Sequence, residues 1–167
     1  MAKRKFGLIS DTHGHIHPDI AKHFAGVEGI LHAGDVCGDD VYATLDGIAP
    51  LSAVAGNCDR VTKELPLRRT VELPFGQAGI AHGHLYASSI RERLHDLVRA
   101  FQGPRMRLIL TGHSHQALME TVDGILIVNP GAASPPRMGA DSSLAVLTWD
   151  DVADSLDVKM IPLKKWK

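Results

Sequence analysis

Five short segments of the chain combine metal-ligating residue types with glycine. Carboxylate and amide oxygens together with imidazole nitrogens form a mixed donor set that suits Mn, Fe, Zn or Ni, whereas a set of thiolates would select zinc. Seven such donors are more than one tetrahedral ion can use, and a carboxylate can bridge two ions. The segments are Asp11-Thr12-His13-Gly14, Gly34-Asp35, Gly56-Asn57, His82-Gly83-His84 and Gly112-His113-Ser114-His115.

Each segment follows a short apolar run of the kind that forms a buried strand. A backbone that turns sharply after a strand often needs positive φ, or must let an ion approach the main chain, and glycine permits both. The chain also has ten histidines but only two Trp, two Tyr and four Phe. This excess of histidine over aromatic residues indicates that the protein uses imidazole groups in its chemistry.

The first third of the chain alternates strands and helices. Continuous apolar runs predict strands at 6–10, 29–33 and 51–55, a helix that starts near Pro18 carries Ile20, Phe24 and Val27 on one face, and a second helix spans 40–48. Strands separated by helices pair in parallel with right-handed crossovers. The polar residues behind each strand should therefore meet at one sheet edge.

The remainder of the chain is rich in antiparallel strands. One helix is predicted over 88–101, and Asp123-Gly124 is a strong hairpin signal between two strands. The predicted strands are 69–73, 79–82, 107–110, 118–122, 125–128, 143–148 and 156–161. Together the two regions indicate an α/β fold with two mixed sheets and helices outside.

Length and composition predict one domain over residues 1–167. The hydrophobic fraction is 44% and the net charge is -1, so the chain should be soluble and has no positive field to collect nucleic acid. No apolar run reaches the ~20 residues of a membrane span. The N-terminus lacks the apolar region of a signal peptide, which predicts a cytoplasmic location.

The five segments, in this order, resemble those of the calcineurin-like metallophosphoesterases. Asn129-Pro130-Gly131 further resembles the small prokaryotic phosphodiesterase branch, which is related to the retromer scaffold subunit. The resemblance implies a two-sheet β-sandwich flanked by helices in α-β-β-α order. It also implies a dinuclear centre in which Asp35 bridges two divalent ions. One ion takes Asp11, His13 and His115, and the other takes Asn57, His82 and His113.

The resemblance implies a metal-dependent phosphoesterase whose nucleophile is a metal-bridging hydroxide. Mn is the expected metal, with Ni, Fe, Zn or Mg as alternatives. His84 and Arg137 are expected to bind the substrate phosphate, and His84 to assist catalysis. Where the broader family often has a histidine that protonates the leaving group, this chain has Cys58, with Asp59 able to orient an imidazole there. A weak acid at this position favours phosphodiesters, or monoesters with good leaving groups.

Several other interpretations remain open. A non-catalytic scaffold of the same fold and a nuclease with the same centre are the alternative functions, and a homo-oligomer is possible. Cys58 is a poor candidate for a nucleophile because Arg60 follows too closely to close a phosphate-binding loop. His15 and His32 are expected to orient ligands, to contact phosphate or to fill space. No role is assigned to His17, His23 or His95.

Overall fold

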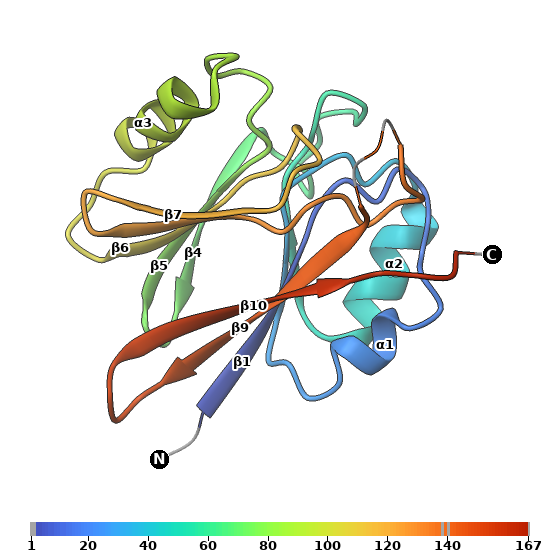
Figure 1. Ribbon diagram of the computed structural model, residues 1–167, viewed down its shortest axis with the longest axis horizontal. Coiled ribbons are helices and arrows are strands. Elements are labelled where there is room, and N and C mark those ends of the chain that lie inside the picture. The colour runs from blue at the N-terminus through green and yellow to red at the C-terminus, as the bar shows by residue number, and fades with distance from the viewer. Residues whose placement is uncertain (1–2, 138, 140, 167) are drawn as a thin grey trace.

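The computed structural model describes residues 3–137, 139 and 141–166, and two five-stranded sheets pack face to face within them (Figure 1). Helices cover the outer faces of both sheets, which confirms the predicted α-β-β-α arrangement. None of the helices in the described ranges is long and apolar enough to cross a membrane.

The first sheet has the strand order β10-β9-β1-β2-β3. Strands β1, β2 and β3 are parallel, as predicted, while β9 pairs antiparallel with β1 and β10 pairs antiparallel with β9. The strands are β1 (Lys3–Ile9), β2 (Ile30–His32), β3 (Leu51–Ala53), β9 (Ser143–Asp150) and β10 (Ser155–Pro162).

The second sheet has the order β4-β5-β6-β8-β7. Strands β5, β6 and β8 are parallel, and β4 and β7 are antiparallel edge strands. Both Asp123 and Gly124 have positive φ, the geometry that the tight β7–β8 hairpin requires. The strands are β4 (Arg68–Leu73), β5 (Gly76–Ala81), β6 (Met106–Leu110), β7 (Leu118–Val122) and β8 (Ile125–Asn129).

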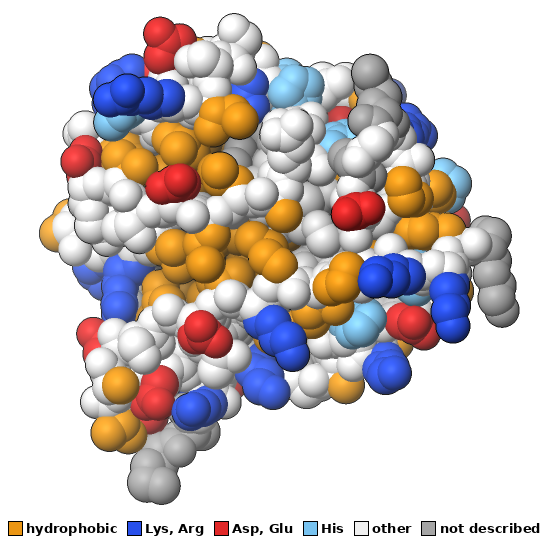
Figure 2. Space-filling model, viewed as in Figure 1, with side chains coloured by type: hydrophobic (Ala, Val, Ile, Leu, Met, Phe, Trp, Pro, Cys, Tyr) orange, Lys and Arg blue, Asp and Glu red, His pale blue; other side chains and the backbone are white. Residues whose placement is uncertain are grey.

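Three apolar clusters hold the layers together. The central one lies between the sheets and includes Leu8, Leu31, Ile80 and Leu108, all buried. The other two lie between each sheet and its helices. Figure 2 shows hydrophobic side chains gathered on this face between β7 and the β9–β10 hairpin.

The helices differ in how well the sequence pattern predicted them. Helix α2 (Asp39–Ile48) and helix α3 (Ile90–Ala100) match the prediction, and the hydroxyl of Ser89 caps α3 by accepting a hydrogen bond from the backbone N–H of Glu92. Helix α1 (Ile20–His23) is much shorter than its apolar spacing predicted. It ends there because the chain turns at Gly26, whose φ is +76°.

The five polar segments follow the carboxyl ends of parallel strands from both sheets. They come after β1, β2 and β3 in the first sheet and after β5 and β6 in the second. In Figure 1, β1 runs from the N-terminus at the bottom toward these loops in the upper half of the view. The sandwich therefore gathers the five segments at one end.

Asp59 fastens two of these loops together. Its carboxylate accepts hydrogen bonds from the backbone N–H groups of Val36 (3.1 Å), Cys37 (2.8 Å) and Gly56 (2.9 Å). These contacts join the loop after β2 to the loop after β3, a role for Asp59 that its place beside Cys58 in the sequence does not indicate.

His32 connects the loop after β1 to the loop after β2. It is completely buried, and burial lowers its pKa to about 4, so the ring is neutral. Its Nδ1 accepts a hydrogen bond from the backbone N–H of Gly34, which leaves Nε2–H to donate to Thr12 Oγ1 at 3.0 Å. The Thr12 hydroxyl donates in turn to the carbonyl of Val36. Among the roles predicted for His32, these contacts fit the positioning of the backbone that carries the ligands.

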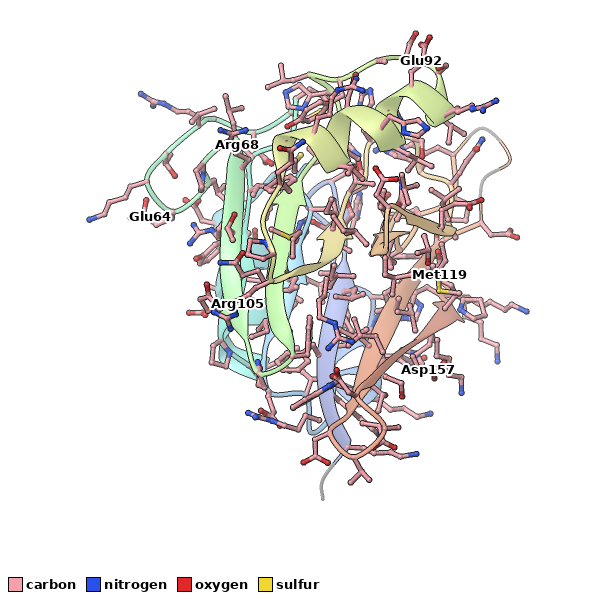
Figure 3. The ribbon with its side chains drawn as sticks, turned by 90° about the vertical axis from the view of Figure 1, so that its left-hand side faces the viewer. Glu64, Arg68, Glu92, Arg105, Met119 and Asp157 are labelled. Carbon is pink, nitrogen blue, oxygen red and sulfur yellow. The ribbon has the colours of Figure 1, made fainter. Side chains whose placement is uncertain are left out.

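We expect Asp59→Ala to lower the free energy of unfolding by about 2–4 kcal/mol, because three backbone donors lose a charged acceptor. Urea denaturation of the metal-free protein measures the change. Asp157→Ala is the matched control, since Asp157 is exposed on β10 (Figure 3) and its removal should cost about 0.5 kcal/mol or less. Equal stability of the two variants would show that Asp59 does not hold the loops.

Candidate metal centre

Asp11 is the buried anchor of the site. Its Oδ2 accepts hydrogen bonds from Ser10 Oγ at 2.6 Å and from the backbone N–H of His113 at 3.1 Å. Its Oδ1 is fully buried and accepts no hydrogen bond from any described residue. Burying a carboxylate oxygen without a hydrogen-bond donor costs free energy. A cation or a donor is therefore expected to bind this atom.

Three imidazoles surround that unpaired oxygen. The Nε2 atoms of His115, His13 and His82 lie 3.2, 3.7 and 3.7 Å from Asp11 Oδ1. The Nε2 atoms of His13 and His115 are 3.2 Å apart. These nitrogens converge on one carboxylate oxygen as ligands around a cation do, and the donor set fits a divalent metal.

Asp35 lies between two of the imidazoles. Its Oδ1 accepts a hydrogen bond from the backbone N–H of Cys58 at 2.8 Å. Its Oδ2 lies 3.5 Å from His13 Nε2 and 3.3 Å from His82 Nε2. A carboxylate that faces a donor from each side is suited to bridge two cations.

Asn57 completes a second group of donors. Its Oδ1 lies 3.0 Å from His82 Nε2 and 3.1 Å from His113 Nδ1. His82 Nδ1 donates a hydrogen bond to the carbonyl of Ala33 at 2.8 Å, which directs Nε2 toward the site. The structure thus brings all seven predicted ligands together, in two adjoining groups.

The charges of the cluster are coupled. Burial alone would raise the pKa of Asp11, but the nearby imidazoles of His115 and His13 hold it well below its usual range. Burial likewise lowers the pKa of His82, yet Asp35 and Asp11 outweigh it and raise that pKa. The carboxylates are therefore ionised and attract positive charge, which imidazolium or a metal cation can supply.

The backbone is strained where the donors lie. Five of the seven predicted ligands have φ in the left-handed region, between +45° and +71°, which L-residues other than Asn and Asp seldom adopt. They are Asp11, His13, Asp35, His113 and His115. Such strain gathers at functional sites, where the surrounding structure holds it in place.

Two glycines of the segments are required by close approach. A Cβ atom at Gly56 would lie 2.1 Å from Asp35 Oδ1, and one at Gly112 would lie 2.0 Å from Ser10 Oγ and 2.5 Å from Asp11 Oδ2. Any larger residue would displace the carboxylates. This explains why glycine accompanies the ligand residues in these two segments.

His84 and Arg137, the predicted phosphate-binding residues, lie at the margin of the cluster. The His84 ring is 5.4 Å from the ring of His82 and 6.2 Å from that of His113, and burial lowers its pKa. Arg137 is exposed; the Asp11 carboxylate raises the pKa of His115, and the charge of Arg137 opposes that rise. Their role in binding a phosphate stays a prediction.

Cys58 and Cys37 lie on the outer rim. Burial, more than the neighbouring carboxylates, raises the pKa of each thiol, that of Cys37 to about 12. A protonated thiol is a poor nucleophile, in agreement with the sequence analysis. A cavity of about 570 Å³ opens beside the two cysteines, and its wall includes Glu64, on the loop that leads to β4 (Figure 3).

Sequence reasoning missed several positioning contacts. One is the clamp at Asp59, and another is the amide of Asn129, which donates to the carbonyl of Gly112 and to Ser114 Oγ and so shapes a ligand loop. The approach of Cys37 Sγ to within 3.8 Å of His13 Nδ1 is a third. The Gly-Asn-Cys-Asp turn and the Asn-Pro-Gly motif were the available signals. His15 is exposed, and its ring lies edge-on to that of Trp166.

Curated relatives support a phosphoesterase. The chain is 32% identical over 161 residues to a probable metallophosphoesterase of Methanothermobacter thermautotrophicus, covering 93% of this chain and 90% of that protein. It is 28% identical over 149 residues to a phosphodiesterase of Methanocaldococcus jannaschii, covering 76% and 82%.

Solved structures share the fold. A Streptococcus pneumoniae protein described as a predicted phosphoesterase matches with a TM-score of 0.74 and 25% identity, covering 97% of this chain and 91% of that one. A mutant Vps29 of Entamoeba histolytica matches with a TM-score of 0.73 and 20% identity, covering 96% and 99%. The model of the calcineurin-like phosphoesterase superfamily domain matches residues 5–152. With its five segments gathered at one end of the sandwich, the chain belongs to the calcineurin-like phosphoesterase superfamily.

Proposed function

We propose that the chain hydrolyses phosphate esters, phosphodiesters above all, with two divalent cations held by the seven clustered donors. The observation that carries this proposal is the buried Oδ1 of Asp11, which lacks a hydrogen-bond donor among the described residues and faces three imidazole nitrogens. Asp11, His13 and His115 would hold one ion, Asn57, His82 and His113 would hold the other, and Asp35 would contribute to both. Mn²⁺ is the proposed metal.

Two cations at such a site would act as Lewis acids, generate the attacking hydroxide from water at neutral pH and stabilise the charge of an in-line displacement. The protein residues set the geometry for this chemistry. Asp35 offsets the repulsion between the cations, while the Ala33 carbonyl holds the ring of His82 in the orientation that presents Nε2. The strained loops keep the donors fixed before substrate arrives.

The substrate is proposed to bind over the two donor groups. His84, neutral because its pKa is lowered, would donate a hydrogen bond to a phosphate oxygen, and the Arg137 guanidinium would pair with its charge. Cys58 lies between the donors and the cavity, so the leaving group would depart past it. The cavity is large enough for the remainder of a small phosphate ester.

The donor set and the charge of the chain also argue against the alternative functions. A scaffold gains nothing from seven chelating side chains, five of them on strained backbone, whereas an enzyme requires them. The Vps29 neighbour is 20% identical, and this likeness shows a shared fold alone. The near-neutral charge of the chain gives little attraction for the phosphate backbone of nucleic acid, so a small ester is favoured over DNA or RNA.

We expect Asp35→Asn to abolish turnover of bis(nitrophenyl) phosphate and to lower metal content, because a neutral amide does not offset the repulsion between two cations. Steady-state kinetics with added Mn²⁺, Ni²⁺, Mg²⁺ or Zn²⁺, together with elemental analysis, measure both effects. Asp157→Asn should behave as the wild type. Two metals per chain and a normal rate in Asp35→Asn would remove Asp35 from the bridging role.

Metal removal should lower the melting temperature by about 5–10 °C. Ligands from five loops are drawn together in the folded state alone, and a ligand at 100 times its Kd adds about 2.7 kcal/mol, at about 2–4 °C per kcal/mol for a chain of this length. Thermal melts before and after chelation measure the shift, and Mn²⁺ added back should restore it. Identical melts in protein shown to be metal-free would contradict the proposed site.

Cys58→His should raise kcat/KM for alkyl esters relative to nitrophenyl esters by roughly 10², because a positioned imidazolium protonates an alkoxide that a thiol does not. A nitrophenolate leaves without that help. Cys58→Ser, which removes the thiol without adding an imidazole, is the matched control. An unchanged ratio in folded, metal-loaded Cys58→His would show that position 58 does not face the leaving group.

A further inference from the structure

The two cysteines of the chain meet on the outer side of the proposed centre. Cys37 follows β2 and Cys58 follows β3, yet their sulfurs and an imidazole nitrogen of His13 all lie within 4.8 Å of one another. Cys37 Sγ is 3.8 Å from His13 Nδ1. Two thiols and an imidazole are the donor set that zinc and other thiophilic ions prefer.

The spacing of these donors is close to what one ion needs. Ligand bonds of 2.0–2.3 Å in a tetrahedral site place the ligand atoms about 3.3–3.8 Å apart. The Cys37–His13 pair already has that spacing, so only a small closure of the third donor is required. Both cysteines are exposed and line the 570 Å³ cavity, which leaves a path for an ion and room for a water as the fourth ligand.

Hydrogen bonds to Asp59 hold the loop that carries Cys37 in this arrangement. Asp59 accepts the backbone N–H of Cys37, and Asp35 Oδ1 accepts that of Cys58. The backbones of both cysteines are therefore fixed by buried or half-buried carboxylates. Because both thiols are exposed, packing in the core does not account for their convergence.

The two ring nitrogens of His13 face two different groups of donors. Its Nε2 faces Asp11, Asp35 and His115, while its Nδ1 faces Cys37. A neutral imidazole has a single lone pair, so it can coordinate a cation on one side at a time. An ion on the thiol side and an ion on the carboxylate side therefore compete for His13.

We propose that Cys37, Cys58 and His13 Nδ1 form a separate binding site for one thiophilic cation, such as Zn²⁺ or Cd²⁺. Its occupancy withdraws His13 from the dinuclear centre and weakens binding of the harder Mn²⁺ there. Coordination replaces two S–H bonds with two sulfur–metal bonds and releases two protons to solvent, with no change of oxidation state. The weakening of Mn²⁺ binding rests on the proposed function, whereas the thiol site itself does not.

Cd²⁺ titration of the full chain, kept reduced with a phosphine, tests the site directly. Because these are the only two cysteines in the sequence, thiolate-to-cadmium charge-transfer absorption reports on them alone. We expect the absorption to saturate at one Cd²⁺ per chain, and Cys37→Ser to weaken that binding at least 10-fold. Tyr42→Phe alters the same cavity without removing a donor and should titrate as the wild type does. No such absorption, or equal absorption in Cys37→Ser, would overturn the proposal.

Release of bound Mn²⁺ tests the competition for His13. Electron paramagnetic resonance of free Mn²⁺ should show that one equivalent of Cd²⁺ weakens Mn²⁺ binding at least 10-fold in the wild type and little in Cys37→Ser. Equal release from both proteins would show that His13 is not shared. If the chain binds no Mn²⁺ while the cadmium absorption is intact, the dinuclear centre fails and the thiol site stands.

Discussion

The structure depends on one buried carboxylate at the end of a central strand. Asp11 lies between the two sheets' polar ends, with one oxygen satisfied by Ser10 and the backbone of His113 and the other facing imidazoles. Burying an anion is unfavourable unless positive charge or donors surround it. The loops from both sheets converge on this group, and the remaining donors are arranged around it.

That convergence is maintained by hydrogen bonds to backbone rather than by packing alone. Asp59 joins the loops after β2 and β3, His32 joins the loops after β1 and β2 through Thr12, and Asn129 shapes the loop after β6. Positive φ at most of the clustered donors shows that these loops are not in their locally preferred conformations. Rigid support of this kind places ligands accurately before an ion or substrate binds.

His13 is shared by the proposed dinuclear centre and the proposed thiol site. Toward the sandwich its imidazole meets carboxylates, which favour hard divalent ions, and toward the cavity it meets sulfur, which favours soft ones. If both proposals hold, one ring at this boundary would let the supply of a thiophilic ion influence binding of harder metals at the proposed centre. The same boundary places Cys58 between the proposed centre and the space where a leaving group would depart.

The order of strands and helices, the parallel pairing of the first three strands and the polar segments at strand ends could all be predicted from the sequence. This is so because apolar runs, glycine turns and a hairpin signal such as Asp123-Gly124 are local properties of the chain. Helix α1 was predicted too long because its apolar spacing is satisfied by packing rather than by helix beyond His23. Only the tertiary structure decided that Asp59 binds backbone, that Asp11 Oδ1 lacks a donor among the described residues, and that Cys37 meets His13. Each of these contacts joins loops distant in the sequence, and their geometry exists only once both sheets have packed.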